Sequence, residues 1–442
     1  MSISQCKSPG PKTLLASFAI GAFASSVLHA TNDWPGYRGA DRTGTWNQEN
    51  VLEQFPQPEL PAKWRAPIGA GYSGPTVAGD RVFVMDRPEE KEEERILCFD
   101  RKTGEQRWVH TYPCSYEEVG YSHGPRASVT IDNDRAYAIG TMGHLHCLDT
   151  TTGEVLWDVD CEEVYSIDLP LWGIAGSPLV EGDLVIVQIG GADGACIVAF
   201  DKNTGDEAWR ALDDKASYVS PMMIEQAGKR ILIAWTGARI AAMDAASGEI
   251  HWEMETPPKR WPINISAPVL DESGERMFLT TIQEGSRLLK LDTDELAMEQ
   301  LWARSGVSEQ NTDALQCMIS PPLFLGDYVY GFDSKGELRC LDAATGDRIW
   351  ESIGEAVRDG IWSTVFMVQN GDRTWMFTEE GNLVIAELSP EGYTEISRTK
   401  IIEPSTFLRR RSVDVAWSHP AFAGTEVFAR NDRELVCVDV GP

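Results

Sequence analysis

The chain has 442 residues, of which 39 are basic and 68 acidic, so its formal net charge at pH 7 is −29. A surface this acidic repels phosphate backbones and anionic lipid, which argues against nucleic-acid binding. We interpret the charge as a solvated surface, with attraction of calcium or of a basic partner as the alternative. A chain of this length can bury a large core.

The first thirty residues have the features of a secretory signal peptide. They contain Lys7 and Lys12, no acidic residue, and an apolar run from Leu14 to Leu28. The run is short for a membrane span, although a retained anchor is the alternative. No cysteine for lipid attachment follows it, so we predict no stable membrane anchor after cleavage. We expect a periplasmic or secreted protein whose mature part begins near residue 31.

Residues 31–61 form an extension ahead of the main domain. The segment Asp33–Arg38 is too rich in aromatic residues for a free linker, so we expect it to pack on that domain. The proline-rich stretch from Phe55 to Pro61 predicts an extended lead-in.

The rest of the chain, residues 62–442, is organised around one repeated phrase. In five copies a short apolar run ends in Asp, with Gly four residues later and Trp eight residues later. Asp can accept hydrogen bonds from following backbone N–H groups and Gly adopts positive φ, so each copy predicts a tight hairpin with a buried Trp. The Asp and Trp residues of the copies are Asp100 and Trp108, Asp149 and Trp157, Asp201 and Trp209, Asp244 and Trp252, and Asp342 and Trp350.

The spacing of the phrase predicts the architecture. Weaker copies at Asp292, Glu387 and Asp439 complete a series with steps of 43 to 52 residues, which suits four-stranded propeller blades. We therefore predict an all-β propeller with eight four-stranded antiparallel blades. The last copy lacks its Trp, and residues 62–68, which include Trp64, supply the missing strand. Pairing of these two segments would close the ring and remove two sheet edges.

A second pattern marks the inner strands. A small or aromatic residue beside proline precedes each hairpin, as in Gly176–Pro178 and Ser266–Pro268, and proline suits the first residue of a strand. Loops between blades should then emerge on the face opposite the Thr-Gly turns, and binding sites often reside on such loops. The longer inserts are Pro113–Gly124, Cys161–Gly173, Ser305–Gln316 and Ile402–Val415.

The phrase Asp-x-x-Thr-Gly-x-x-x-Trp over residues 62–442 resembles that of the PQQ-repeat propellers. That family includes quinoprotein alcohol dehydrogenases and the non-catalytic outer-membrane assembly protein BamB. The resemblance implies the fold, because the motif lies in structural turns. In the dehydrogenases, adjacent cysteines lie over the cofactor, acidic and amide side chains hold calcium, and an Asp acts as base. This sequence has no Cys-Cys pair, and its acids do not align with the calcium site, so a PQQ- and calcium-dependent oxidoreductase is our alternative hypothesis.

Other chemistry has weak support in the sequence. His144 and His146 share a strand face without an evident third ligand, so we predict no metal site and no catalytic residues. Cys114 and Cys161 lie in consecutive interblade inserts, where an oxidising compartment allows a disulfide; free thiols are the alternative. Several other cysteines precede the repeat Asp by two residues and predict buried hydrophobic positions, namely Cys98, Cys147, Cys340 and Cys437.

The candidate site is the mouth of the central channel. Aromatic and hydrogen-bonding residues fall at or just before the starts of the inner strands, a composition suited to a ligand or peptide. The alternative is that they plug the channel or cap the seams between blades. The basic run Arg409–Arg411 could pair with the acidic surface or receive a carboxylate. The candidate residues are Tyr72, Tyr121, His123, Arg126, Trp172, Tyr218, Asn264, Gln316, Trp362, Trp417 and His419.

These observations predict an exported, monomeric propeller that serves as a non-catalytic binding or assembly scaffold. Its partner would be a protein or peptide bound at the face of the interblade loops.

Overall fold

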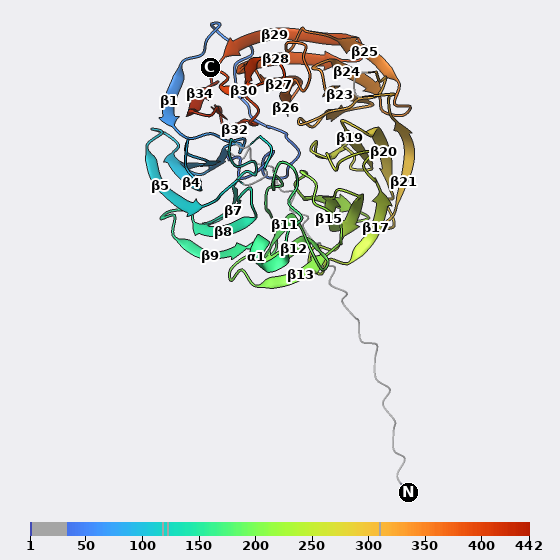
Figure 1. Cartoon of the computed structure of the whole chain (residues 1–442). Coiled ribbons are helices and arrows are strands. Elements are labelled where there is room, and N and C mark those ends of the chain that lie inside the picture. Colours follow the sequence, from blue (N-terminus) through green and yellow to red (C-terminus); the bar gives the residue numbers. More distant parts are fainter. Residues whose placement is uncertain (2–32, 117–118, 122, 309–310) are drawn as a thin grey trace.

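The computed structural model describes Met1 and residues 33–116, 119–121, 123–308 and 311–442. These residues form a ring of eight four-stranded antiparallel sheets around a central axis (Figure 1), which confirms the predicted eight-bladed propeller. The predicted signal peptide, residues 1–30, lies outside the described residues except for Met1. In the described part of the chain, no helix is long and apolar enough to cross a membrane.

Seven blades consist of consecutive strands, numbered from the axis outwards. Blade 1 contains β2 (Thr76–Ala78), β3 (Arg81–Asp86), β4 (Glu93–Asp100) and β5 (Gln106–Pro113). Blade 2 contains β6 (Thr130–Asp132), β7 (Arg135–Ile139), β8 (His144–Asp149) and β9 (Val155–Asp160). Blade 3 contains β10 (Leu179–Glu181), β11 (Leu184–Gly191), β12 (Ala195–Asp201) and β13 (Glu207–Ala211). Blade 4 contains β14 (Met222–Gln226), β15 (Lys229–Trp235), β16 (Arg239–Met243) and β17 (Ile250–Glu255).

The second half of the ring repeats this plan. Blade 5 contains β18 (Val269–Leu270), β19 (Arg276–Thr281), β20 (Gly285–Leu291) and β21 (Met298–Arg304). Blade 6 contains β22 (Leu323–Leu325), β23 (Tyr328–Phe332), β24 (Leu338–Asp342) and β25 (Arg348–Ser352). Blade 7 contains β26 (Val365–Asn370), β27 (Arg373–Thr378), β28 (Asn382–Ser389) and β29 (Gly392–Lys400). The interblade loops add helix α1 (Cys161–Tyr165) and a hairpin of β30 (Thr406–Leu408) and β31 (Val413–Val415).

Blade 8 combines the two ends of the propeller. Its inner strands are β32 (Ala421–Ala423), β33 (Glu426–Arg430) and β34 (Glu434–Asp439), and its outermost strand is β1 (Ala62–Pro67). β1 pairs antiparallel with β34, with Trp64 opposite Cys437. This pairing closes the sheet between the first and last strands of the ring, so neither presents an open edge to the other.

The repeated phrase forms a clasp between one blade and the next. In the turn after β4, Asp100 Oδ1 accepts a hydrogen bond from the Thr103 amide (2.9 Å), and the Gly104 amide donates to the Asp100 carbonyl (2.8 Å). Gly104 has φ of +73°, and a Cβ added to it would lie 2.6 Å from the indole of Trp64. Trp64 Nε1 donates to the Arg101 carbonyl in the same turn (2.8 Å). Glycine is therefore required both for the turn and for the close approach of the indole.

The same clasp joins most blades around the ring. Two blades differ: the outermost strand of blade 7 has no Trp, and Trp252 donates to Gln226 Oε1 of its own blade (2.9 Å), next to a turn after Asp292 that has no glycine. The other indole donors and their carbonyl acceptors are Trp108 to Thr150 (3.0 Å), Trp157 to Lys202 (3.1 Å), Trp209 to Ala245 (3.0 Å), Trp302 to Ala343 (2.9 Å) and Trp350 to Ser389 (2.9 Å).

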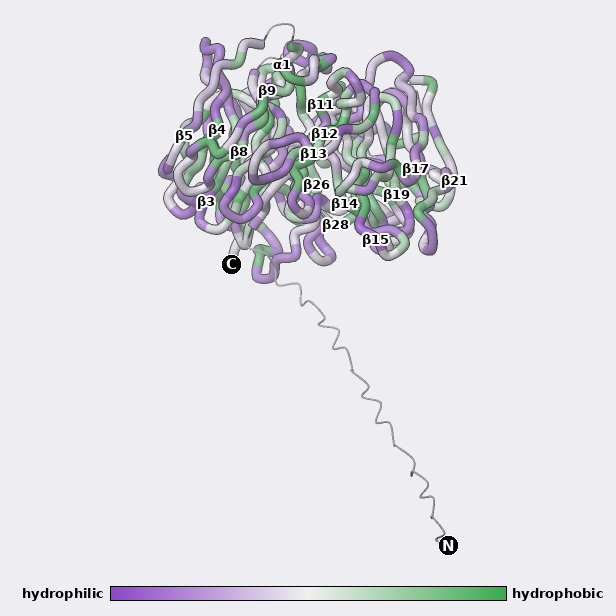
Figure 2. Tube along the Cα trace, turned by 90° about the horizontal axis from the view of Figure 1, so that it is seen from below, coloured by the Kyte–Doolittle hydropathy of each residue, from purple (hydrophilic) through white to green (hydrophobic). Residues whose placement is uncertain are grey.

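The extension enters the ring from the face that carries the Thr-Gly turns, which is also the face of the turns between the first two strands of each blade. Trp34 exchanges two backbone hydrogen bonds with Val77 of β2 (2.8 and 2.9 Å). Trp46 is buried, donates from Nε1 to the Gly424 carbonyl (3.1 Å), and meets Trp375 edge-on with ring centroids 5.1 Å apart. In Figure 2, α1 lies at the opposite face from the C-terminus. The interblade loops and the extension thus occupy opposite faces of the ring.

Candidate functional site

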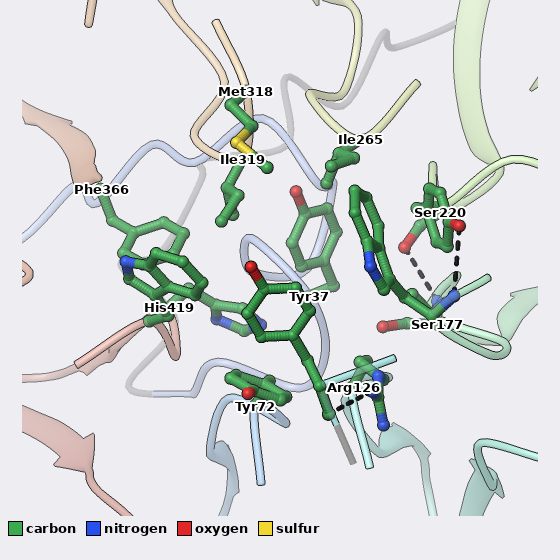
Figure 3. A pocket seen from close by; sticks show the side chains of 15 residues that line it. Tyr37, Tyr72, Arg126, Ser177, Ser220, Ile265, Met318, Ile319, Phe366 and His419 are labelled. Atoms are coloured by element: carbon green, nitrogen blue, oxygen red, sulfur yellow. Dashed lines mark hydrogen bonds between the residues drawn. The ribbon is translucent and has the colours of Figure 1, made fainter. Parts of the chain in front are cut away.

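A cavity opens at the centre of the face that carries the interblade loops. It holds about 910 Å³ of empty space, counting its open mouth. Of the described residues that line it, only Arg126 carries a full charge at neutral pH, and most of the others are aromatic or aliphatic (Figure 3). The lining residues are Tyr37, Tyr72, Tyr121, Arg126, Trp172, Ala175, Ser177, Tyr218, Ser220, Ile265, Met318, Ile319, Phe366, Trp417 and His419.

One wall of the cavity is an aromatic arc. Trp172 and Tyr218, from the segments before β10 and β14, have ring centroids 5.0 Å apart. Tyr121 continues the arc, at 6.2 Å from Trp172 and 6.1 Å from Trp417. The Tyr218 hydroxyl accepts a hydrogen bond from the Trp172 amide (3.3 Å), which fixes the two rings relative to each other. Neighbouring blades therefore contribute one aromatic ring each to a continuous surface.

The facing wall is aliphatic. Ile265, Met318 and Ile319 come from the segments before β18 and β22, and Figure 3 shows them on the side of the cavity away from Arg126 and Tyr72. A planar or branched apolar group would fit between these side chains and the aromatic arc.

The extension forms the floor of the cavity. Tyr37 meets His419 edge-on with ring centroids 5.1 Å apart, and burial raises the pKa of Tyr37. Arg42 is buried and donates to the carbonyls of Pro221 (2.6 Å), Ser177 (3.3 Å) and Pro178. Burial lowers the pKa of Arg42 to about 10, which leaves it charged at neutral pH. The segment between Tyr37 and Arg42 separates this cavity from a wider hollow at the opposite face, of about 2510 Å³.

His419 and Ser128 form a hydrogen-bonded pair beneath the cavity. The Ser128 hydroxyl donates to the Gly74 carbonyl (3.1 Å), so it accepts a hydrogen bond from the N–H of His419 Nε2 (2.8 Å). Burial lowers the pKa of His419 to about 4, so the ring is uncharged at neutral pH. Ser128 is completely buried. The pair therefore orients His419 and does not present a nucleophile to the cavity.

Serines of the inner strands link neighbouring blades around the channel. Ser177 Oγ accepts from the Ser128 amide (2.9 Å), and Ser220 Oγ accepts from the Ser177 amide (2.9 Å). These contacts explain why serine recurs beside the prolines that start the inner strands.

Arg126 orders the loop between blades 1 and 2. Its Nη2 donates to the carbonyls of Gly120 (2.9 Å) and Tyr121 (2.6 Å), and its guanidinium lies 5.4 Å from the ring centre of Tyr72. Tyr72 in turn shares a 2.9 Å hydrogen bond with His123 Nδ1. Its Nη1 also donates to the Gly124 carbonyl and to Thr141 Oγ1 (3.4 Å), and none of the ion pairs among the described residues includes Arg126.

The basic run at the rim divides into two environments. Arg411 pairs with Glu379 (2.6 Å); their side chains are 9% and 2% exposed. Glu379 also accepts from Trp417 Nε1 (3.0 Å), which holds this wall of the cavity in place. Burial raises the pKa of Glu379 despite the neighbouring Arg411. Arg410 instead lies over the ring of Trp362 (4.8 Å) and is close enough to Tyr121 to oppose the burial that raises the pKa of Tyr121.

The structure brings most of the predicted mouth residues into the cavity lining and leaves four out. His123 lies behind Tyr72, and Trp362 lies under Arg410 at the rim. Asn264 and Gln316 are buried and donate to the carbonyls of Thr236 (2.8 Å) and Ile282 (2.7 Å). The predicted residues that line the cavity are Tyr72, Tyr121, Arg126, Trp172, Tyr218, Trp417 and His419.

Other lining residues were missed by the sequence analysis. Ile265, Met318 and Ile319 stand just before the Ser-Pro or Ser-Ala-Pro signals, so the inner-strand pattern could have identified them. Tyr37 could not be found in this way, because the path of the extension is set by tertiary packing and not by the repeat.

Neither a metal centre nor a disulfide is found in the described part of the chain. His110 of β5 joins His146 of β8, with ring centroids 5.1 Å apart, but no group of His, Cys, Asp or Glu there is arranged to hold a metal ion. Cys114 and Cys161 are free, buried thiols in different core clusters. The disulfide considered from the sequence is therefore not formed in this structure.

Comparison with known proteins places the fold in a family. The family model described as "Outer membrane protein assembly factor BamB" matches residues 92–352 and 238–441, together more than half of the chain. The chain belongs to this BamB family. Similar BamB proteins include those of Yersinia pestis, 21% identical over 56% of this chain and 62% of that protein, and Shewanella oneidensis, 22% identical over 76% and 93%. The chain thus spans less than two thirds of the Yersinia pestis relative.

Solved structures share the fold at low sequence identity. BamB from Moraxella catarrhalis superposes with a TM-score of 0.57 at 16% identity, over 86% of this chain and 99% of that one. A quinohemoprotein alcohol dehydrogenase from Comamonas testosteroni superposes with a TM-score of 0.65 at 14% identity, over 93% and 81%. A BamB protein and an alcohol dehydrogenase therefore share the same ring, and function has to be argued from the site.

Proposed function

We propose that this protein is an exported, non-catalytic scaffold that binds a polypeptide partner through the face of its interblade loops. The observation that carries the proposal is the aromatic cavity at the centre of that face. The names of its BamB relatives, outer membrane protein assembly factors, support a partner in envelope assembly. We place the protein in the periplasm on the same grounds.

The exposed apolar side chains support the same face. Trp261 and Val307 are 59% and 91% exposed on the loops before blades 5 and 6. Among the described residues, no large exposed apolar side chain lies in a turn of the opposite face. Six further exposed apolar side chains are spread over the outermost strands around the side of the ring, whereas those of the interblade loops share one face, as at interaction surfaces. The others on interblade loops are Tyr121, Val164, Leu171, Ile353 and Phe407.

The cavity chemistry does not fit the alternative, a quinone cofactor held with calcium. Calcium requires several oxygen ligands from carboxylates, amides or carbonyls. Within the part of the chain that the structure describes, the lining includes no carboxylate and no side-chain amide. The likeness to the quinohemoprotein dehydrogenase is one of fold alone, at 14% identity.

Site-specific photo-crosslinking in living cells tests the proposal. A photoreactive amino acid is placed at Leu171, Trp261 or Phe407 on the interblade face, and at Thr151 or Ala246, which are exposed in turns of the opposite face. We expect discrete adducts with envelope proteins from the first three positions and none from the two control positions. Adducts formed equally well from both faces, or only from the turns, would refute the proposed binding face.

A further inference from the structure

We propose that the cavity receives the carboxyl-terminal residue of the partner polypeptide. Its apolar side chain would lie between the aromatic arc and the aliphatic wall, and its α-carboxylate would contact Arg410 and lie close to the charge of Arg126. This inference rests on the scaffold function proposed above and specifies which part of the partner is recognised.

The charges at the mouth favour a carboxylate. The chain carries a net charge of −29, yet Arg126 is the one charged residue among the described residues that line the cavity, and Arg410 lies at its rim. The ion pairs within the described ranges include neither arginine, whereas the neighbouring Arg411 is neutralised by Glu379. Both Nη atoms of Arg126 already donate to nearby protein groups, so Arg126 attracts a carboxylate mainly through its charge. Arg410 makes no hydrogen bond among the described residues, so its guanidinium can bind a carboxylate through charge-assisted hydrogen bonds.

The shape of the cavity favours a chain end. Tyr37 and His419 form its floor, so a polypeptide cannot thread through the ring along this path. The cavity is therefore closed below by this floor and open at the interblade face. A site that is open at one side only accommodates a terminal residue and excludes a continuous strand.

The rim favours a polypeptide over a free small carboxylate. Exposed apolar side chains lie next to the cavity lining: Tyr121 belongs to it, Leu171 precedes Trp172, and Phe407 precedes Leu408, which clusters with Trp417. A small molecule inside the cavity would leave them in water, whereas the residues that precede a bound terminus would cover them. Burial of this apolar surface adds to affinity.

Fluorescence anisotropy with labelled octapeptides tests the inference on the full mature chain. The reference peptide ends in Phe with a free carboxylate; one variant is amidated at its C-terminus and another ends in Ala. We expect each change to weaken binding about tenfold or more, because one loses the charged hydrogen bonds and the other the apolar contacts. Equal affinity for the free and the amidated peptide would overturn the inference.

Two further arms identify the source of the carboxylate and the residues that bind it. N-acetylphenylalanine should displace the labelled reference peptide only at concentrations at least tenfold higher than the unlabelled peptide requires. Equal potency would show that a free aromatic carboxylate is the ligand and would overturn the polypeptide assignment. The native Arg410 side chain makes no hydrogen bond among the described residues. Arg410→Gln should therefore weaken binding of the free-carboxylate peptide about fivefold or more and leave binding of the amidated peptide unchanged. Lys102→Gln, an equal loss of charge in a turn of the opposite face, should change neither; an effect equal to that of Arg410→Gln would refute the contact.

The two proposals fail in different ways. Crosslinks from the interblade face without any preference for a free terminus would reject the terminal-residue inference and keep the scaffold function. Absence of both the crosslinks from the interblade face and the binding of the peptides would reject the scaffold function itself.

Discussion

His146 is a buried histidine that the structure keeps uncharged. It lies between blades 1 and 2, is 6% exposed, and neither ring nitrogen has a hydrogen-bond partner among the described residues. His110 and Tyr112 pack on it with ring centroids 5.1 and 4.4 Å away. Burial lowers the pKa of His146 to about 3, and the charges of His110 and His144 contribute in the same direction. Protonation of His146 therefore opposes folding.

We predict that this histidine makes stability fall in acid. Unfolded histidine has a pKa near 6.5, so below that pH the unfolded chain binds a proton that the folded chain does not. Above pH 6.5 the His146 ring is neutral in both states and costs nothing. As the pH falls from 6.5 towards the folded pKa, the free energy of unfolding drops by up to about 1.4 kcal/mol per pH unit. His146→Phe should flatten the decline in urea-unfolding free energy between pH 7.5 and 5. His251→Phe, on the outer strand of blade 4, should retain it; an unchanged slope in His146→Phe would contradict the assignment.

At the scale of the element, the turn glycine beside each indole has two roles that can be separated. Gly205 has φ of +77°, and an added Cβ would lie 2.8 Å from the indole of Trp157. Gly182 has φ of +57°, but an added Cβ would have no neighbour within 4 Å. Both glycines follow the same backbone preference, and only Gly205 also has the indole contact.

We therefore predict unequal costs for two similar substitutions. Gly182→Ala should lower the free energy of unfolding by about 1–2 kcal/mol, the cost of the left-handed conformation. Gly205→Ala should lose that amount and roughly 1–3 kcal/mol more, because the indole must move. Chemical denaturation of both variants measures the difference. Equal losses would show that the indole contact contributes nothing beyond the turn.

The sequence predicts the blades well because one physical contact recurs around the ring. In each Asp-to-Trp phrase the Asp accepts hydrogen bonds from the turn backbone and the Trp packs between two neighbouring blades. The spacing of the phrase therefore gives the length of the blade repeat directly. Interblade inserts occur once each and lack this periodic signal. Asp160 caps α1 by accepting from the amides of Glu162 (3.1 Å) and Glu163 (3.2 Å), yet a helix of five residues leaves no helical period to detect. The hairpin of β30 and β31 was missed because it also lies in an interblade insert that occurs once and has no periodic signal.

At the scale of the whole molecule, the extension turns an open channel into a closed cup. The sequence indicated the mouth residues through the inner-strand signals, but not the floor, because Tyr37 reaches the axis through contacts distant in sequence. Arg42 anchors this segment on carbonyls of blades 3 and 4. These buried carbonyls have a charged donor in the extension, which makes the anchor sensitive to substitution.

We predict that Arg42→Leu releases the extension from the ring. Each buried carbonyl left without a donor costs roughly 1–3 kcal/mol, which the new apolar side chain does not offset. Limited proteolysis followed by mass spectrometry should show faster cleavage within residues 33–47, with the propeller itself intact. Asn47→Ala, an exposed position on the same segment, should behave as wild type. Resistance of Arg42→Leu to cleavage would show that other contacts hold the extension.

The pairing of β1 with β34 has a consequence for the order of synthesis. The ribosome makes β1 before any blade and β34 after all others, so the eighth blade is incomplete until nearly the entire polypeptide exists. During elongation the indole of Trp64 has its turn partner in blade 1 but lacks the strand beside it, and an unpaired strand is prone to wrong associations. Native assembly is thereby postponed to the end of translation. Such a delay suits a chain that must cross a membrane unfolded, as the proposed export requires.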